Sequence, residues 1–231
     1  MTGGGKGIGR AVCEVFAAGG DRVVSVGRTG GPGVDEVCDV AVEEDVVALF
    51  ERLGPVDVLV NNAGISASAP LSRIELADWQ RHLDVNATGV FLCTRAVVGG
   101  MVERRYGRVV TVASILGRMG ARYVAAYTAS KHAAVGLMRA VAAEVAGTGV
   151  TANAVCPGYV RTPMTERSVA RIVERTGKTE DEAVAVLAAA SPLGRLLEPD
   201  EVAQAVWYLA SEAAAAVNGQ TLVIDGGGVQ G

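Results

Sequence analysis

The hydrophobic positions of the chain fall into short, β-branched runs that recur at intervals. These runs are Val23–Val26, Val56–Val60, Arg108–Val112, Val150–Val155 and Thr221–Ile224. They are too short and too apolar to be strands with one face in water. They therefore predict strands that are covered on both faces, as in a parallel sheet.

Segments with helical spacing of their apolar residues separate the runs. Thr179 and Glu182 have the spacing of a capping box, which predicts a further helix start. The expected helices are Arg10–Ala18, Glu43–Leu53, Glu75–Tyr106 with a break, Tyr123–Ala146, Glu180–Ala190 and Pro199–Ala210. Alternating strands and helices predict one doubly wound, Rossmann-type α/β domain over residues 1–231, with helices on both faces of a parallel sheet.

Two features depart from that pattern. Only Met1 precedes the glycine-rich stretch that starts at Thr2, so the first strand is absent from the chain. That strand would normally lie in the middle of the sheet, and its loss is expected to leave neighbouring strands unpaired. One explanation is that the sequence begins inside the true coding sequence.

The second departure is the short stretch between Val26 and Val37. A full crossover with its helix needs at least about 10–12 residues. We therefore expect an irregular link there instead of a helix.

Composition narrows the class of protein. Half of the 231 residues are hydrophobic, and the formal net charge is −4. A mild acidic balance does not fit a protein that binds nucleic acid or an anionic membrane. No apolar run approaches the roughly 18 residues of a membrane span, and the amino terminus does not resemble a signal peptide. The four cysteines and two histidines are scattered, so we expect no metal site and a cytoplasmic protein with reduced thiols.

Five glycines lie among the first nine residues, in the stretch Thr2-Gly3-Gly4-Gly5-Lys6-Gly7-Ile8-Gly9, directly before a predicted helix. A helix amino terminus exposes N–H groups and the positive end of the helix dipole, so it attracts phosphate. Glycines allow a tight turn and a close backbone approach to a pyrophosphate. The loop alone is a weak signal, because glycine-rich turns also serve tight packing.

Further motifs make the chain resemble the short-chain dehydrogenase/reductase family over essentially its whole length. The family has a Thr-Gly-x-x-x-Gly-x-Gly loop, which is similar to residues 2–9. Asp39-Val40, Asn61-Asn62-Ala63-Gly64, and Pro157-Gly158 followed by Thr162-Pro163-Met164 resemble its other characteristic segments. The cofactor-binding residues that this resemblance implies are Gly3, Gly5, Lys6, Gly7, Ile8, Gly9, Arg28, Asp39, Val40, Asn62, Ala63, Gly64, Tyr127, Lys131, Pro157, Gly158, Val160 and Thr162.

A candidate catalytic set follows the same order as in the family. Tyr127 and Lys131 are four residues apart in a predicted helix, so their side chains lie on one face. A nearby cation favours the phenolate and lowers the pKa of a tyrosine. Ser114 comes at the end of a predicted strand, where ligands bind in open α/β sheets, and Asn86 matches the family's fourth catalytic position.

The resemblance implies a role for each of these residues. Tyr127 is the general acid in reduction and the base in oxidation. Lys131 tunes it and binds the nicotinamide ribose, and Ser114 stabilises charge on the substrate oxygen. Asn86 holds a water molecule that connects Lys131 to solvent. His82, expected to be partly exposed, and His132, expected to pack, are assigned no catalytic role.

The cofactor expected from the sequence is NADP(H), with NAD(H) as the alternative. An acidic residue at the end of the second strand selects NAD, whereas a cation accommodates the 2′-phosphate of NADP. The chain has Gly27-Arg28 at that point and Lys6 in the glycine loop. Arginine suits phosphate because its donors form a planar fork. Both cations could equally be solvated surface residues.

Residues 162–198 resemble the family's substrate lid. Met164, Val169, Ile172, Val186 and Leu187 could line an apolar pocket there, or could form ordinary core. The chain also resembles 3-oxoacyl-thioester reductases, 3-hydroxyacyl-CoA dehydrogenases and aromatic polyketide ketoreductases. It lacks the Pro-Gly-Gly that many of the last group carry after Gly64, so a 3-oxoacyl-type or unspecialised carbonyl reductase is favoured.

Three functional hypotheses therefore stand. The first is an NADP(H)-dependent reductase of a small carbonyl or acyl-thioester substrate. The second is an NAD-dependent 3-hydroxyacyl dehydrogenase that works oxidatively. The third is a non-catalytic nucleotide-binding protein, made inert by the absent strand. By resemblance to the family, a homo-oligomer (a tetramer or a dimer) is expected.

Overall fold

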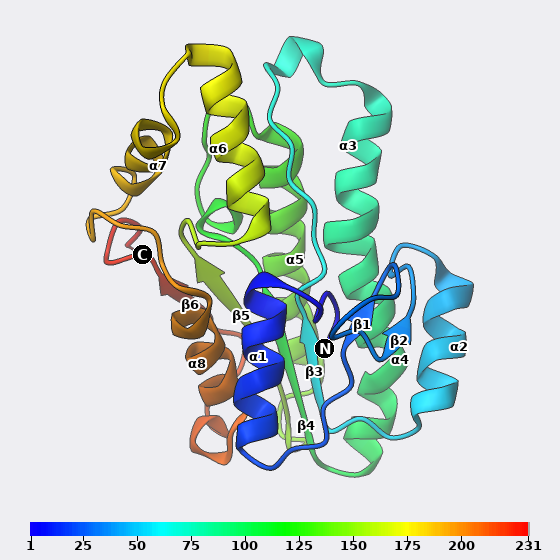
Figure 1. Cartoon of the computed structure of the whole chain (residues 1–231). Coiled ribbons are helices and arrows are strands. Elements are labelled where there is room, and N and C mark those ends of the chain that lie inside the picture. Colours follow the sequence, from blue (N-terminus) through cyan, green and yellow to red (C-terminus); the bar gives the residue numbers. More distant parts are fainter. Residues whose placement is uncertain (231) are drawn as a thin grey trace.

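A computed structural model describes residues 1–230 and shows a parallel sheet between two layers of helices (Figure 1). The main sheet has four strands in the order β3-β4-β5-β6, all parallel. Their bounds are β3 Val58–Asn61, β4 Gly107–Val112, β5 Val150–Pro157 and β6 Thr221–Ile224. The expected α/β fold with a parallel sheet is confirmed.

The helices occupy the predicted segments. α1 and α8 lie side by side over one face of the sheet, while α2, α4 and α5 pack on the other (Figure 1). The α-helical bounds are α1 Gly7–Ala18, α2 Glu43–Leu53, α3 Leu76–Leu83, α4 Gly89–Glu103, α5 Ala125–Glu144, α6 Pro163–Thr176, α7 Glu180–Ala188 and α8 Pro199–Ala210; the short turns are η1 Leu71–Arg73, η2 Asp84–Thr88, η3 Ile115–Gly117 and η4 Glu212–Ala214. The capping box at Thr179 and Glu182 is present at the start of α7.

The break predicted between residues 75 and 106 is η2, a π-helical turn over Asp84–Thr88 that joins α3 to α4. Together they form a helix, Leu76–Glu103, that is long and apolar enough to cross a membrane by length and composition. Here α4 packs on the sheet, and its Val90, Cys93 and Met101 are almost fully buried. Core packing is a sufficient reason for its apolar composition.

The position of the absent first strand is taken by the first residues of the chain. Met1–Gly3 run between β1 (Val26–Gly27) and β3, where the Thr2 N–H donates to the carbonyl of Val60. The Met1 ammonium group donates to the Val24 carbonyl. Only Val26 and Gly27 of this region are paired as a strand, in place of the expected Val23–Val26. On the side of β3, the pairing of this segment is a single isolated bridge between Thr2 and Val26.

The link after β1 is irregular, as expected. β1 pairs with β2 (Glu36–Val37) in a separate two-stranded parallel sheet, and residues 28–35 between them contain no helix. The Ser25 hydroxyl donates to the Gly33 carbonyl, and the Ser25 N–H donates to the Asp35 carboxylate. These contacts hold the link against β1 and close to the glycine loop.

Candidate active site

The predicted site residues meet at one edge of the sheet. Asn62, Ala63 and Gly64 follow β3, Ser114 follows β4, and Pro157 ends β5. Parallel strands present their carboxyl ends on the same side, and ligands bind there in open α/β sheets. α6 and α7, from the expected lid, stand above this edge (Figure 1).

The glycine loop forms a compact turn into α1. A Cβ atom on Gly9 would lie 2.1 Å from the Gly3 carbonyl oxygen, so only glycine allows the helix to pack so closely on the turn. In residues 1–230 no side chain caps the amino terminus of α1, and its first turn contains no acidic residue. The free N–H groups and the helix dipole there suit an anion.

This cradle fits the pyrophosphate of a dinucleotide cofactor. The residues that would hold it are the loop glycines, Lys6 and Ile8. A Cβ atom on Gly7 would lie 3.1 Å from the Thr162 side chain, so the start of α6 rests directly against the loop. The two segments that resemble opposite ends of the cofactor site are therefore adjacent.

The turn after β3 is hydrogen-bonded to the glycine loop. The Thr2 hydroxyl accepts from the N–H groups of Asn62 and Ala63, at 3.0 and 3.1 Å. The Asn62 side-chain amide donates to the carbonyls of Thr2 and Gly3. Its observed contacts are thus to protein, and its expected contact with the cofactor stays a prediction.

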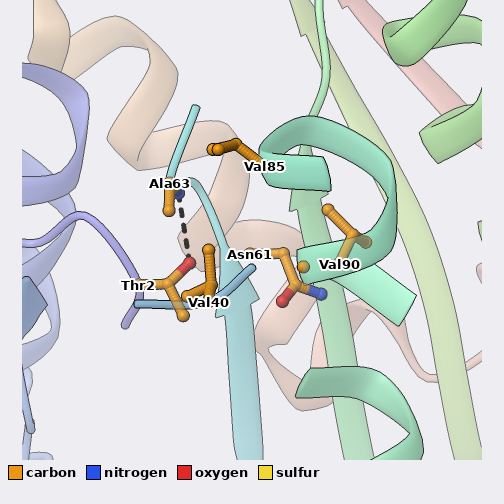
Figure 2. Close-up of a pocket in the computed structure, with 7 residues that line it drawn as sticks. Thr2, Val40, Asn61, Ala63, Val85 and Val90 are labelled. Carbon is orange, nitrogen blue, oxygen red and sulfur yellow. Dashed lines mark hydrogen bonds between the residues drawn. The ribbon is translucent and has the colours of Figure 1, made fainter. Parts of the chain in front are cut away.

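A narrow pocket lies behind these residues (Figure 2). Val40 and Ala63 line it, and the buried Asn61 Oδ1 atom at its edge has no hydrogen-bond partner within residues 1–230. The Asp39 carboxylate accepts from the Ala41 N–H, and the cofactor contact expected of Asp39 and Val40 stays a prediction.

Tyr127 and Lys131 share one face of α5, as their spacing predicts. The Lys131 Nζ atom lies 5.7 Å from the centroid of the Tyr127 ring and donates to the Val112 carbonyl at 2.9 Å. Ser114 directly precedes η3, where its hydroxyl accepts from the Leu116 N–H. Tyr127 and Ser114 are also close enough for their hydroxyl groups to interact.

Burial dominates the protonation of the pair. It raises the pKa of Tyr127 to about 12, although the Ser114 hydroxyl acts in the opposite direction. It also lowers the pKa of Lys131 to about 8. Lys131 is not among the groups that shift the pKa of Tyr127, and its ammonium group is directed at the Val112 carbonyl. The lowering of the tyrosine pKa by the cation therefore stays a prediction.

Asn86 lies within η2, and its side chain makes three hydrogen bonds. Its Oδ1 atom accepts from the Ile65 N–H, while its Nδ2 atom donates to the Ile65 carbonyl and to the Ser130 hydroxyl, each at 2.9 Å. π-Helical turns interrupt the regular backbone hydrogen bonding of a helix and often lie at functional sites. The role expected of Asn86 in holding a water molecule stays a prediction.

Gly64 brings Asn86 and Lys131 together. A Cβ atom on Gly64 would lie 3.3 Å from Asn86 Oδ1 and 3.7 Å from Lys131 Nζ. A side chain at this position would crowd both groups. The turn after β3, η2 and α5 therefore converge on the lysine.

Two expectations about the histidines were wrong. His82 is almost fully buried: its Nδ1 atom lies 2.7 Å from the Asp78 carbonyl, and its Nε2 atom accepts from the Ala67 N–H. Its helix is covered by the loop after β3, which sequence periodicity did not reveal. His132 is exposed and contacts the Thr128 carbonyl one turn earlier.

Three of the five apolar residues singled out in the lid segment form core. Val169 and Leu187 are buried with Ala183 and Leu196 in a small cluster between α6 and α7, and Ile172 packs against it. Val186 is 48% exposed, so its expected inward orientation was wrong. The apolar spacing of this segment reflects the packing of the two helices on each other.

Two residues that the sequence analysis missed connect elements of the site. Ser130 is fully buried and donates to the Tyr127 carbonyl while it accepts from Asn86. Arg171 of α6 donates to the carbonyl and hydroxyl of Ser68, in the loop after β3. A polar residue on the buried face of α5 was the available signal for Ser130; nothing in the sequence pairs Arg171 with Ser68.

Comparison with known proteins agrees with this geometry. The family described as Enoyl-(Acyl carrier protein) reductase matches residues 3–228. A 3-oxoacyl-[acyl-carrier-protein] reductase of Escherichia coli strain K12 is 34% identical, over 98% of this chain and 95% of its own length. The chain belongs to the short-chain dehydrogenase/reductase family. It is therefore an oxidoreductase of that family, consistent with the placement of Ser114, Tyr127 and Lys131.

Polyketide enzymes of the family are also similar to this chain. The granaticin polyketide synthase putative ketoacyl reductase 1 of Streptomyces violaceoruber is 39% identical, over 98% of this chain and 91% of the relative. A structure of a single-site variant of the actinorhodin polyketide ketoreductase with NADPH superimposes with a TM-score of 0.90 at 39% identity, covering 98% and 94% of the two chains. The similarity to ketoreductases supports reduction of a ketone with a nicotinamide cofactor.

Proposed function

We propose that this chain reduces the ketone of a 3-oxoacyl thioester, or of a similar carbonyl compound, to a secondary alcohol with NADPH. The observation that carries the proposal is the convergence of Ser114, Tyr127 and Lys131 at the edge of the sheet, next to the glycine loop. A bound nicotinamide would supply the hydride to the carbonyl carbon. The protein's own groups act on the carbonyl oxygen and on the proton.

In this proposal the Ser114 hydroxyl donates a hydrogen bond to the carbonyl oxygen and stabilises the charge that develops there. Tyr127 then gives its phenolic proton to that oxygen. A phenol with a pKa of about 12 remains a competent acid, because the alkoxide that forms is much more basic. Lys131 is mainly protonated at neutral pH, given its pKa of about 8, and stabilises the phenolate left behind.

The preference for NADPH is supported by Arg28, which is exposed just after β1. Residues 26–30 contain no acidic side chain that would bind the free ribose hydroxyls of NADH. The related actinorhodin ketoreductase structure contains NADPH. The 3-oxoacyl substrate is supported by the similarity to 3-oxoacyl-[acyl-carrier-protein] reductases.

The test follows cofactor absorbance at the nicotinamide band, with acetoacetyl thioesters and a panel of plain and cyclic ketones, using NADPH and NADH in parallel. We expect turnover of the thioester with NADPH and a kcat/KM at least roughly tenfold lower with NADH, the scale of losing one charge-assisted phosphate contact. Arg28→Asp should reverse that ratio. An unchanged affinity for NADPH in Arg28→Asp, together with faster oxidation of the 3-hydroxy compound by NAD, would favour the oxidative alternative.

A further inference from the structure

The shortened link between β1 and β2 packs against the glycine loop. A Cβ atom on Gly5 would lie 2.8 Å from a methyl group of Val34. A Cβ atom on Gly27 would lie 2.9 Å from the same methyl group. Val34 therefore fills the side-chain space of both glycines, one in the phosphate-binding loop and one directly before Arg28.

Hydrogen bonds to Ser25 fix the position of the link between β1 and β2. The N–H groups of Asp35 and Glu36 donate to the Ser25 carbonyl, at 2.9 and 3.1 Å. The Ser25 hydroxyl donates to the Gly33 carbonyl at 2.6 Å, and its N–H donates to Asp35 at 2.8 Å. Gly33 has a φ of +73°, a conformation that a larger residue would adopt only with strain.

The position of Val34 relates it to the ribose end of the cofactor. The pyrophosphate belongs at the glycine loop, and the adenosine ribose at the end of the strand that carries Arg28. Val34 packs against Gly5 of the glycine loop and against Gly27, which directly precedes Arg28. It is half-buried and uncharged, so it contributes volume without an acceptor for ribose hydroxyls or a charge opposed to phosphate.

We infer that Val34 is a specificity-determining residue for the cofactor, through which the shortened link forms an apolar wall beside the phosphorylated ribose. This inference rests on the proposed use of NADPH. The wall leaves the 2′-phosphate to Arg28 and Lys6, the cations at the end of β1 and in the glycine loop. A carboxylate in place of the Val34 isopropyl group would accept hydrogen bonds from free ribose hydroxyls and repel a 2′-phosphate.

The experiment is direct binding, which needs no turnover. Titration calorimetry would measure NADP⁺, NAD⁺ and the fragment adenosine 2′,5′-bisphosphate against wild type, Val34→Asp and Val34→Thr at moderate ionic strength. We expect Val34→Asp to weaken NADP⁺ and the fragment by roughly tenfold or more, while NAD⁺ binds equally well or more tightly. Val34→Thr keeps the β-branched shape and adds a neutral hydroxyl in place of the charge, so both affinities should stay within about threefold of wild type.

Val37→Asp is the matched control. Val37 is the same residue type in the adjoining strand β2, but 57% of it is exposed. It should leave the ratio of the NADP⁺ and NAD⁺ dissociation constants within about twofold of wild type, because an exposed charge is screened by solvent and salt. Equal loss of NADP⁺ affinity in Val34→Asp and Val37→Asp would overturn the inference, because only general charge would then be acting.

Other outcomes are also distinguishable. If wild type binds neither nucleotide, the proposed function fails. If wild type binds NADP⁺ but Val34→Asp leaves the ratio unchanged, only the role of Val34 fails. Thermal melting of each variant checks that it folds. If Val34→Asp does not fold, Val34→Asn tests the contact with the ribose hydroxyls without adding a charge. The inference then requires Val34→Asn to bind NAD⁺ more tightly than wild type, and an unchanged NAD⁺ affinity would contradict it.

Discussion

Tyr127 is the residue on which the proposed chemistry depends most. Its phenol lies near Ser114 and on the same helix face as Lys131. Tyr127→Phe removes the proton donor without changing the ring. We expect kcat to fall by roughly 10²–10⁴-fold, the usual contribution of a positioned general acid, with little change in NADPH binding.

The matched control is Tyr208→Phe, on the exposed surface of α8. It should retain the wild-type kcat. Stopped-flow absorbance gives the rate, and a fluorescence titration gives NADPH affinity. Equal rates in Tyr127→Phe and wild type would remove Tyr127 from the mechanism.

Burial of the Lys131 ammonium group lowers the stability of the folded protein. Its folded-state pKa of about 8 lies below the ordinary value of 10.5 because the amine is buried. Between these values the unfolded chain binds more protons than the folded chain, so stability rises with pH in that window. The buried charge therefore destabilises the fold most below about pH 8.

We predict that Lys131 contributes an increase of on the order of 2 kcal/mol to the free energy of unfolding of wild type between about pH 7.5 and about pH 9.5. The buried cysteines, whose raised pKa values act in the opposite direction, contribute equally in wild type and in Lys131→Met. Lys131→Met should be more stable than wild type at the lower pH and should lose this increase. Above about pH 10 the raised pKa of Tyr127 acts in the opposite direction, since the unfolded phenol ionises first. Urea denaturation at the two pH values tests the prediction, and parallel curves for wild type and variant would contradict it.

At the scale of the elements, hydrophobic spacing predicted α2 and α8 with their observed bounds, and it predicted that the helical stretch of residues 75–106 is interrupted, without giving the position. It could not predict that this break is a π-helical turn that directs Asn86 toward Ile65 and Ser130, because those partners are distant in sequence. It also could not separate a helix pair that packs on itself from one that lines a pocket. Val169 and Leu187 are the example.

Arg171 connects α6 to the loop after β3 across 103 residues of sequence. Removing its two hydrogen bonds to Ser68 should loosen the proposed lid. We predict that Arg171→Ala raises KM for the thioester several-fold and speeds proteolysis within α6, because lids commonly govern substrate retention. Hydrogen bonds that involve a charged group contribute about 1.5–3 kcal/mol each.

Arg175→Ala serves as the control, since Arg175 lies on the same helix one turn later and is exposed. Steady-state kinetics and limited proteolysis compare the two variants. Identical KM values and cleavage rates for Arg171→Ala and Arg175→Ala would show that the contact with Ser68 does not hold the lid.

At the scale of the whole molecule, Met1–Gly3 lie between β1 and β3 and are hydrogen-bonded to both. The Thr2 N–H donates to the Val60 carbonyl of β3, while the Met1 carbonyl accepts from the Val26 N–H of β1 and the Gly3 N–H donates to the Val26 carbonyl. The Thr2 hydroxyl also accepts from two N–H groups of the turn after β3. The sequence showed that one strand was short of residues, but it did not show that Met1–Gly3 would occupy that position. The expected assembly into a dimer or tetramer stays a prediction.

The four catalytic candidates could be located from sequence because their order and spacing match the family. Their protonation could not, because it depends on burial that only the packed fold defines. Val34 is the same kind of case: its importance comes from contact with Gly5 and Gly27, which are 29 and 7 residues away in the chain.

The most direct test of the whole account follows the transferred hydrogen. Wild-type protein is incubated with NADPH that carries deuterium at the transferable nicotinamide position and with an acetoacetyl thioester, and the product is analysed by mass spectrometry. The account predicts a 3-hydroxyacyl thioester with one deuterium on carbon 3, and no such product when Tyr127→Phe is used for the same short time. Product without deuterium at carbon 3, or no product from wild type with any carbonyl compound of the panel, would contradict it.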